Sequence, residues 1–205
     1  IGRYSLSLVK AIIRNRGKHE IIIALSGLFP DSIEDLRATF DGLLPQENIR
    51  IWEAVAPVRE CDIGNETRRE VGEIMREAFL VNLQPDLILI TSLFEGFVDD
   101  ALTSIKKFDK YTKVAVILYD LIPLIQKDVY LQYNNLYAMH YNQKIGFLKN
   151  ADFLLSISQS SSNEAIEHLG FEQSKVFNIS SAVDENFSIQ NINEIDKQKL
   201  YSKYG

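Results

Sequence analysis

The chain has 205 residues, of which 46% are hydrophobic and 24% charged, enough for one large α/β domain with a full core. Its formal charge of −6 is a poor match for phosphate backbones, so we expect no nucleic-acid partner. The single cysteine, Cys61, excludes an internal disulfide and fits a cytoplasmic protein, and three scattered histidines give no metal site. The longest apolar runs are far shorter than the ~20 residues that span a bilayer.

Short apolar runs alternate with amphipathic stretches along the chain. The runs predict six strands, at residues 20–27, 48–55, 86–92, 113–120, 152–158 and 175–180. Helices are predicted before Gly17, over 31–40 behind an Asp31-Ser32 cap, from Asn65 onward, over about 129–149, over 160–170 with Ser161 or Ser162 as the cap, and over 195–205. The helix after Asn65 has an apolar stripe that we expect to pack inward, at Val71, Ile74, Met75, Ala78 and Phe79.

Several of the predicted strands are unbroken apolar runs rather than alternating ones. Such strands are typical of a parallel sheet covered by helices on both faces, so the fold class is α/β, Rossmann-like and doubly wound. Ligands bind such sheets at the carboxyl ends of the strands. The residue pairs found there are mostly polar or small: Ser26-Gly27, Ala56-Pro57, Thr91-Ser92, Tyr119-Asp120, Ser158-Gln159 and Ser180-Ser181.

Three features of this edge have both a functional and a structural interpretation. Gly2, beside Arg3, could let backbone N–H groups at the start of the first helix approach an anion, or could simply allow a turn. Asp120 could accept hydrogen bonds from sugar hydroxyls, or could tie down the loop that leads to Pro123. Glu95, beside Gly96, could bind substrate hydroxyls or cap a helix over about 97–106.

Two helical patterns are open in the same way. A tyrosine stripe on the long helix, at Tyr130, Tyr133, Tyr137 and Tyr141, is more often a packed face than a sugar platform, with Tyr130 and Tyr133 as the exceptions. The serines of residues 158–162 could hold an anion or act as helix caps. The carboxylates of residues 65–77 are interpreted as a solvated, ion-paired helix face.

In their order and spacing, four stretches resemble the N-terminal half of GT-B glycosyltransferases, and most closely the "group 1" retaining mannosyl- and glucosyltransferases. These stretches are IGRYSLSLVKAI, YDLIPL, ADFLLSISQSSSNEAIEHLG and KVFNISSAVDENF. The resemblance implies that residues 1–189 form the Rossmann-like acceptor-side domain, without the family's first strand. Residues 190–205 would then be the linker to an absent C-terminal donor-binding domain.

The resemblance also assigns roles to individual residues. Gly2 matches the loop glycine beside the donor diphosphate, with Arg3 next to it, and Asp120 matches the acid of the family's His-Asp pair. Tyr119 stands where the family has the histidine, and Gln159 where it has a glutamate after Ser158. The implied catalytic residues are Tyr119 and Asp120. The implied substrate-binding residues are Tyr4, Glu95, Gly96, Tyr130, Tyr133, Ser158, Gln159 and Ser160.

The implied reaction is glycosyl transfer with retention from a nucleotide-sugar to a saccharide or lipid-linked acceptor. It needs no cofactor and no metal, and this half alone is expected to be inactive. The partners are then the two substrates and the protein's own C-terminal domain. The setting is cytoplasmic, with contact at the inner face of the membrane left open. Two alternatives stay open: a non-catalytic sugar- or nucleotide-binding module, and a GT-B-shaped sugar-nucleotide epimerase.

Overall fold

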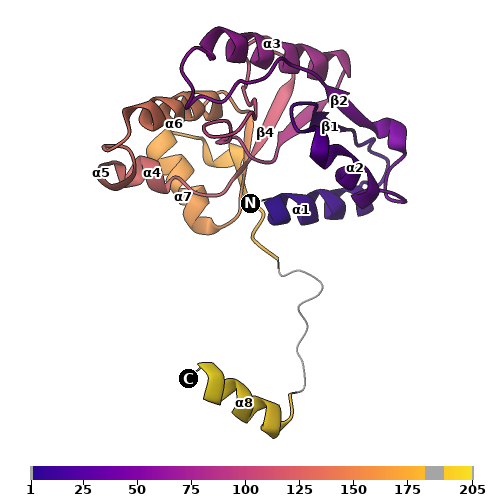
Figure 1. The fold of residues 1–205 in the computed structure, drawn as a ribbon, viewed down its shortest axis with the longest axis vertical. Coiled ribbons are helices and arrows are strands. Elements are labelled where there is room, and N and C mark those ends of the chain that lie inside the picture. The colour runs from indigo at the N-terminus through magenta and orange to yellow at the C-terminus, as the bar shows by residue number, and fades with distance from the viewer. Residues whose placement is uncertain (1, 183–191, 205) are drawn as a thin grey trace.

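A computed structural model describes residues 2–182 and 192–204 of the chain, and Figure 1 shows its ribbon. The strands are β1 (Ile23–Ser26), β2 (Ile49–Trp52), β3 (Leu87–Ile90), β4 (Lys113–Leu118), β5 (Phe153–Ser156) and β6 (Val176–Asn178). The helices are α1 (Gly2–Arg14), α2 (Pro30–Thr39), α3 (Glu66–Asn82), α4 (Ile122–Ile125), α5 (Lys127–Tyr130), α6 (Asn135–Leu148), α7 (Gln159–Leu169) and α8 (Glu194–Tyr204). Two 3-10 turns, η1 (Gln46–Asn48) and η2 (Gln173–Lys175), precede β2 and β6. All six predicted strands are therefore confirmed.

The strands are all parallel, and helices flank them, which confirms the predicted Rossmann-like α/β class. In the view of Figure 1, α3 lies above the strands and α1 below them, and α6 and α7 lie to the left of β4. The strands fall into two sheets, one of order β1-β2 and one of order β3-β4-β5-β6. The prediction of a single sheet therefore needs correction, because within the described residues β1 pairs with β2 alone and β3 with β4 alone.

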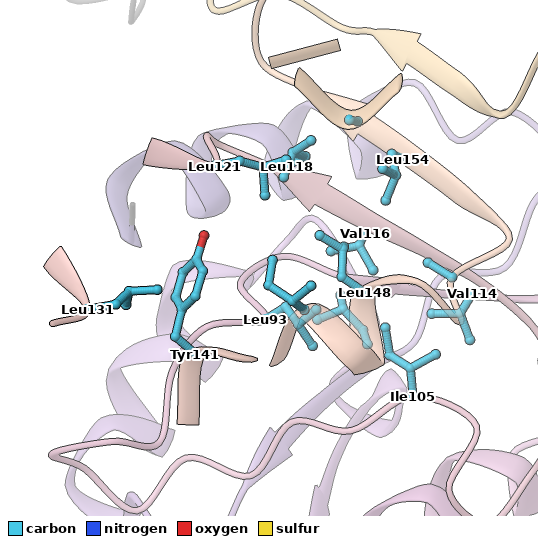
Figure 2. Packing of buried hydrophobic residues seen from close by; sticks show 14 residues of the cluster. Leu93, Ile105, Val114, Val116, Leu118, Leu121, Leu131, Tyr141, Leu148 and Leu154 are labelled. Atoms are coloured by element: carbon cyan, nitrogen blue, oxygen red, sulfur yellow. The ribbon is translucent and has the colours of Figure 1, made fainter. Parts of the chain in front are cut away.

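The main core lies on the four-stranded sheet. Five of the six residues of β4 are buried, and Val116 and Leu154 from neighbouring strands are fully inaccessible. Figure 2 shows these strand residues packed against Leu148 of α6 and Leu93 of the segment after β3. Burial of this many branched side chains on both faces is what the unbroken apolar runs predict.

A second, smaller core joins α1 to the two-stranded sheet. Its buried members are Ile13 of α1, Ile49 of β2, and Phe40 and Leu44 of the segment between α2 and β2. Leu6 and Val9 pack against it from α1. Leu6, Val9 and Ile13 lie at helical spacing, so one face of α1 packs on this core, and the helix predicted before Gly17 is confirmed.

Helix boundaries differ from the predictions where the caps were misread. The predicted Asp31-Ser32 cap is wrong: α2 begins at Pro30 without a side-chain cap. The predicted helix over 129–149 is interrupted, because Asn134 caps α6 by accepting a hydrogen bond from the Tyr137 N–H. Gly170 ends α7 at φ 73°, in the left-handed region that glycine enters without strain.

The orientation of α3 is the largest departure from the sequence interpretation. Its carboxylates Glu73 and Glu77 are buried, with 1% and 6% of their surface exposed, whereas Val71, Ile74 and Met75 are exposed. The predicted solvated face is therefore wrong for these two glutamates. Their partners lie in the segment 91–112, whose polar groups have to be satisfied wherever the segment is buried.

The segment 91–112 contains no helix, so the helix predicted over about 97–106 is wrong. Side chains of α3 hold this segment instead: Glu77 accepts one hydrogen bond from the Ser104 side chain (Oγ, 2.5 Å) and one from the Phe108 backbone N–H (2.6 Å). Lys107 bonds Glu73 at 2.8 Å. The inward carboxylates of α3 therefore hold an irregular segment in place.

Candidate functional site

The start of α1 meets the end of β4 at the carboxyl edge of the four-stranded sheet. Ser5 Oγ lies 2.9 Å from the phenol oxygen of Tyr119, and the Tyr4 and Tyr119 rings make an edge-to-face contact at 5.8 Å. Tyr4 also donates from its phenol to the carbonyl of Ser180, just after β6, at 3.0 Å. Residues far apart in the chain, Gly2 to Ser5, Tyr119 and Ser180, thus share one edge, as the strand-end argument predicts.

Tyr119 remains a protonated phenol at neutral pH. Partial burial raises its pKa, the hydrogen bond from Ser5 lowers it, and the negative charge of Glu95 raises it again. Burial also raises the pKa of Tyr4, and the neighbouring Tyr119 adds to that rise. A protonated phenol can donate one hydrogen bond and accept others, so Tyr119 can bind a ligand oxygen at this edge.

Asp120 is exposed beside Tyr119. One oxygen of its carboxylate accepts a hydrogen bond from the Ile122 N–H at 3.0 Å, which fixes the turn into α4. Tying down the loop before Pro123 is therefore one of its roles. Its charge also contributes to raising the pKa of Tyr137, after the larger effect of burial. Because the Asp120 carboxylate is exposed, it can still accept a hydrogen bond from a hydroxyl group.

Gly2 and Arg3 form the exposed first turn of α1. No described atom beyond the helix's own backbone lies within 4 Å of the place where a Cβ of Gly2 would stand. Packing within the chain therefore does not explain a glycine here. A helix of 13 residues directs its N-terminal N–H groups and the positive end of its dipole toward this edge.

The start of α7 lines the next part of the edge. Ser158 is its cap and accepts from the Ser161 N–H at 3.1 Å, which corrects the prediction that Ser161 or Ser162 is the cap. Ser161 Oγ donates to the carbonyl of Tyr119 at 2.6 Å. Gln159 is exposed and its side-chain oxygen lies 3.5 Å from the Asn178 amide nitrogen. The serines therefore act first as structural partners that fix the position of Tyr119.

Ser160 is exposed and bonds Glu164 on the next turn of α7 at 3.3 Å. Glu164 also accepts from the Leu121 N–H at 3.0 Å. This carboxylate thus joins α7 to the loop that follows Asp120. Ser5, Asn178 and Glu164 contact the predicted site without having been predicted, because no short motif marks a residue whose partners are distant in the chain.

Glu95 is half-buried and accepts a hydrogen bond from Ser92 Oγ at 2.7 Å. The negative charge of Glu95 contributes to raising the pKa of Tyr119, after the larger effect of burial. Gly96 has φ 98°, and a Cβ there would collide with the carbonyl oxygen of Ala101. Backbone conformation therefore accounts for the glycine, whether or not a substrate contacts it.

The tyrosine stripe divides as its spacing predicts. Tyr137 and Tyr141 face the protein, where Phe97 and Phe94 contact their rings. Burial strongly raises the pKa of Tyr141, against a smaller lowering effect of the Leu124 backbone. Tyr130 and Tyr133 are 46% and 84% exposed, so they are free to meet a ligand.

The described residues contain no cluster of three or more candidate metal ligands. Within the same residues no helix has the length and apolar character needed to cross a bilayer.

No protein-family model matches the chain. Over all 205 residues it is 35% identical to a protein of Escherichia coli described as "Serotype-specific mannosyltransferase WbdA", covering 24% of that protein. Two further proteins with the same description are 35% identical over 196 residues, which is 95% of the chain and 24% of each. The chain thus spans about a quarter of the length of these curated relatives. The predicted resemblance to a glycosyltransferase is confirmed at this level: the chain is similar, along its whole length, to one segment of proteins named mannosyltransferases.

Proposed function

We propose that the protein to which this chain belongs is a glycosyltransferase that moves a hexose, mannose in the first instance, from a nucleotide-sugar to a saccharide or lipid-linked acceptor. The observation that carries the proposal is the convergence of the α1 start with Tyr119 at one strand edge. The names of the relatives support the sugar and the reaction class. The GT-B architecture, the "group 1" assignment and a separate C-terminal donor-binding domain belong to the same proposal.

In this proposal Gly2 and Arg3 receive the donor diphosphate. The unobstructed space at Gly2 allows an anion to approach the helix N–H groups, and the Arg3 guanidinium adds a positive charge. Such groups stabilise the charge that develops on the leaving nucleotide, which requires no metal. Retention at the anomeric carbon follows if the acceptor attacks from the face that the nucleotide leaves.

Tyr119 and Asp120 stand at the reactive end of the donor in this proposal. The neutral phenol donates a hydrogen bond to the sugar, and the Asp120 carboxylate accepts from a sugar hydroxyl. Tyr4, Glu95, Gly96, Ser158, Gln159 and Ser160 surround the acceptor along the same edge. Tyr4 contacts the Tyr119 ring, and Ser158 bonds Ser161, which holds the Tyr119 carbonyl. Ser160 bonds Glu164, which accepts from the Leu121 N–H.

Exposed apolar residues in the segment 122–139, which follows Asp120 in the chain, support contact with a lipid-linked acceptor or a membrane face in a cytoplasmic setting. These residues, each at least 41% exposed, are Ile122, Ile125, Val129, Tyr130, Tyr133 and Met139. Exposed patches of this kind often mark a binding surface, and tyrosines suit one that is apolar on one side and wet on the other. Sedimentation of the protein with lipid vesicles tests this contact, and no sedimentation at low salt would exclude it.

The experiment that tests the proposed function uses the full-length protein with a panel of nucleotide-sugars and saccharide acceptors. Nuclear magnetic resonance of the product gives the anomeric configuration, which has to match that of the donor. Tight nucleotide-sugar binding without transfer to any acceptor would support the non-catalytic module instead. A changed sugar configuration in the nucleotide-sugar without acceptor would support the epimerase.

A further inference from the structure

Lys144 is the largest side chain in the described structure that is almost fully inaccessible, with 2% of its surface exposed. It lies on α6, and no carboxylate among the described residues comes within 4.0 Å of its ammonium group. Its hydrogen bonds go instead to Thr103, to the carbonyl at 2.9 Å and to Oγ1 at 2.6 Å. Burying an ammonium without a paired carboxylate costs stability, so a role beyond packing has to be considered.

The hydrogen bonds of Lys144 lead directly to the loop that carries Glu95. Thr103 Oγ1 accepts from Lys144 and donates to the carbonyl of Leu93 at 2.6 Å. The Glu60 N–H bonds the carbonyl of Gly96 at 3.0 Å. The carbonyls of residues 93 and 96, one on each side of Glu95, are thus both held.

His140 lies one turn before Lys144 on α6 and contacts the carbonyl of Phe94, which lies between residues 93 and 96. Its Nδ1 lies 2.8 Å from a Glu60 carboxylate oxygen, and its Nε2 lies 3.5 Å from the carbonyl of Phe94. The ring is 1% exposed, and Arg69 of α3 pairs with the same glutamate at 3.4 Å. Two buried groups on one face of α6 therefore hold the backbone just before Glu95. Lys144 acts on the Leu93 carbonyl through Thr103, and His140 contacts the Phe94 carbonyl directly.

We propose that Lys144, assisted by His140, is a positioning residue that fixes the Glu95–Gly96 loop at the acceptor side of the site and thereby sets acceptor specificity. The proposal deepens, and rests on, the glycosyl-transfer function proposed above. Lys144 itself does not touch the substrate. It acts through Thr103 and Leu93 on the direction in which the Glu95 carboxylate points.

The titration of Lys144 gives the proposal a pH signature. Burial lowers the pKa of Lys144 to about 8, against the smaller opposing effect of Glu73 and Glu60. Arg76 and Arg69, which face it from α3, lower it further, and burial also lowers the pKa of His140 on its own helix. Above pH 8 the lysine therefore becomes neutral and its bonds to Thr103 weaken.

The test compares Lys144→Met, which keeps the length but removes the charge, with Lys149→Met at the exposed end of α6 as the matched control. Thr103→Val provides a second variant that breaks the same path while leaving Lys144 in place. Hydrogen exchange of residues 93–98 is measured in the full-length protein with exchange in β4 and β5 as the internal reference. We expect exchange of this loop to be about 2- to 30-fold faster in both variants, with the reference unchanged.

In transfer assays the acceptor KM is expected to rise about 2- to 30-fold in both variants while the donor KM stays within about twofold. Raising the pH from 7 to 9 should loosen the loop of the wild type but not that of Lys144→Met. Unchanged exchange of residues 93–98, or an equal change in Lys149→Met, would overturn the proposal. If no donor and acceptor pair gives transfer, the proposed function fails, and the exchange measurement still decides the positioning role.

Discussion

β4 and β1 were both predicted from apolar runs, but they differ in how deeply their residues are buried. Both are unbroken apolar runs, yet five of six β4 residues are buried, whereas all four residues of β1 are only half-buried. β4 has strands on both sides, and β1 has one neighbour in the described structure. An apolar run therefore predicts a strand, but the burial of that strand depends on the strands and helices beside it.

The same contrast holds for the surrounding cores. The core on the four-stranded sheet contains fourteen buried residues, and the core that joins α1 to the two-stranded sheet contains four. Most predicted site residues follow strands of the larger core, whereas Gly2, Arg3 and Tyr4 come from the helix over the smaller one. The two regions meet at the Tyr4, Ser5 and Tyr119 contacts. Substitutions at this contact therefore test how far the two regions stabilise each other.

The largest expected effect is on stability, in matched leucine-to-alanine changes in the two strands. Leu118→Ala removes a side chain that is 1% exposed and should lower the free energy of unfolding by about 2–5 kcal/mol. Leu25→Ala in half-buried β1 should cost roughly half as much, because fewer contacts are lost. Chemical denaturation followed by circular dichroism measures both. Equal losses would mean that β1 is as well supported as β4.

The next effect is on activity and concerns the edge of the larger core. Asp120→Asn keeps an oxygen that can accept from the Ile122 N–H but removes the charge, so we expect transfer to fall about 100-fold or more with little change in stability. Asp128→Asn on exposed α5 is the control for loss of a nearby charge. A rate within about twofold of the wild type would reduce Asp120 to its role in the turn before α4.

Local periodicity and strand-end position were enough to predict the strands, the α/β class and the edge that contains Tyr119. They failed at α3, because the stripe of Val71, Ile74 and Met75 has the spacing of a buried face while Glu73 and Glu77 are the residues turned inward. The reason is non-local: the segment 91–112 has no regular backbone pairing and requires acceptors from α3. No sequence pattern within α3 indicates that its glutamates have to serve as acceptors for this distant segment.

The cap of α7 was mispredicted for a similar reason, because distant partners decide which serine is the cap. Several serines at the start of α7 could each have been the cap, and the choice of Ser158 depends on Ser161 being engaged with the carbonyl of Tyr119. Likewise, Ser5 gains its contact only because α1 begins beside the end of β4. Residues that are chosen by distant partners are those that a single sequence does not reveal.

A smaller effect on stability is expected at the contact between the two regions, where Ser5 of α1 meets Tyr119 after β4. A double-mutant cycle with Ser5→Ala and Tyr119→Phe removes the 2.9 Å hydroxyl contact from either side. We expect a coupling energy of about 0.5–1.5 kcal/mol in the free energy of unfolding, the range of a single neutral hydrogen bond. Ser7→Ala, at an exposed position on the same helix, is the control for helix propensity. Strictly additive changes would show that the two regions do not stabilise each other through this contact.

The smallest effect is a difference in the pH dependence of stability. In the unfolded chain Lys144 should titrate near its ordinary pKa of 10.5, whereas burial lowers the pKa in the folded protein to about 8. Between these values the unfolded state holds a proton that the folded state lacks, so the global free energy of unfolding rises with pH, even though the local bonds from Lys144 to Thr103 weaken. Below pH 8 both states are charged, and this contribution is flat.

The wild type should therefore gain stability relative to Lys144→Met between pH 8 and 9.5, measured by urea denaturation at fixed ionic strength. Other lysines and tyrosines titrate in the same window, but they are common to both proteins and cancel in the difference. Parallel curves would mean that Lys144 keeps its charge or is reached by water when folded. Lys144 lies on the side of the larger core. A stability difference that rises with pH would therefore show that the buried charge of Lys144 destabilises this better-packed region, beneath the Glu95 loop.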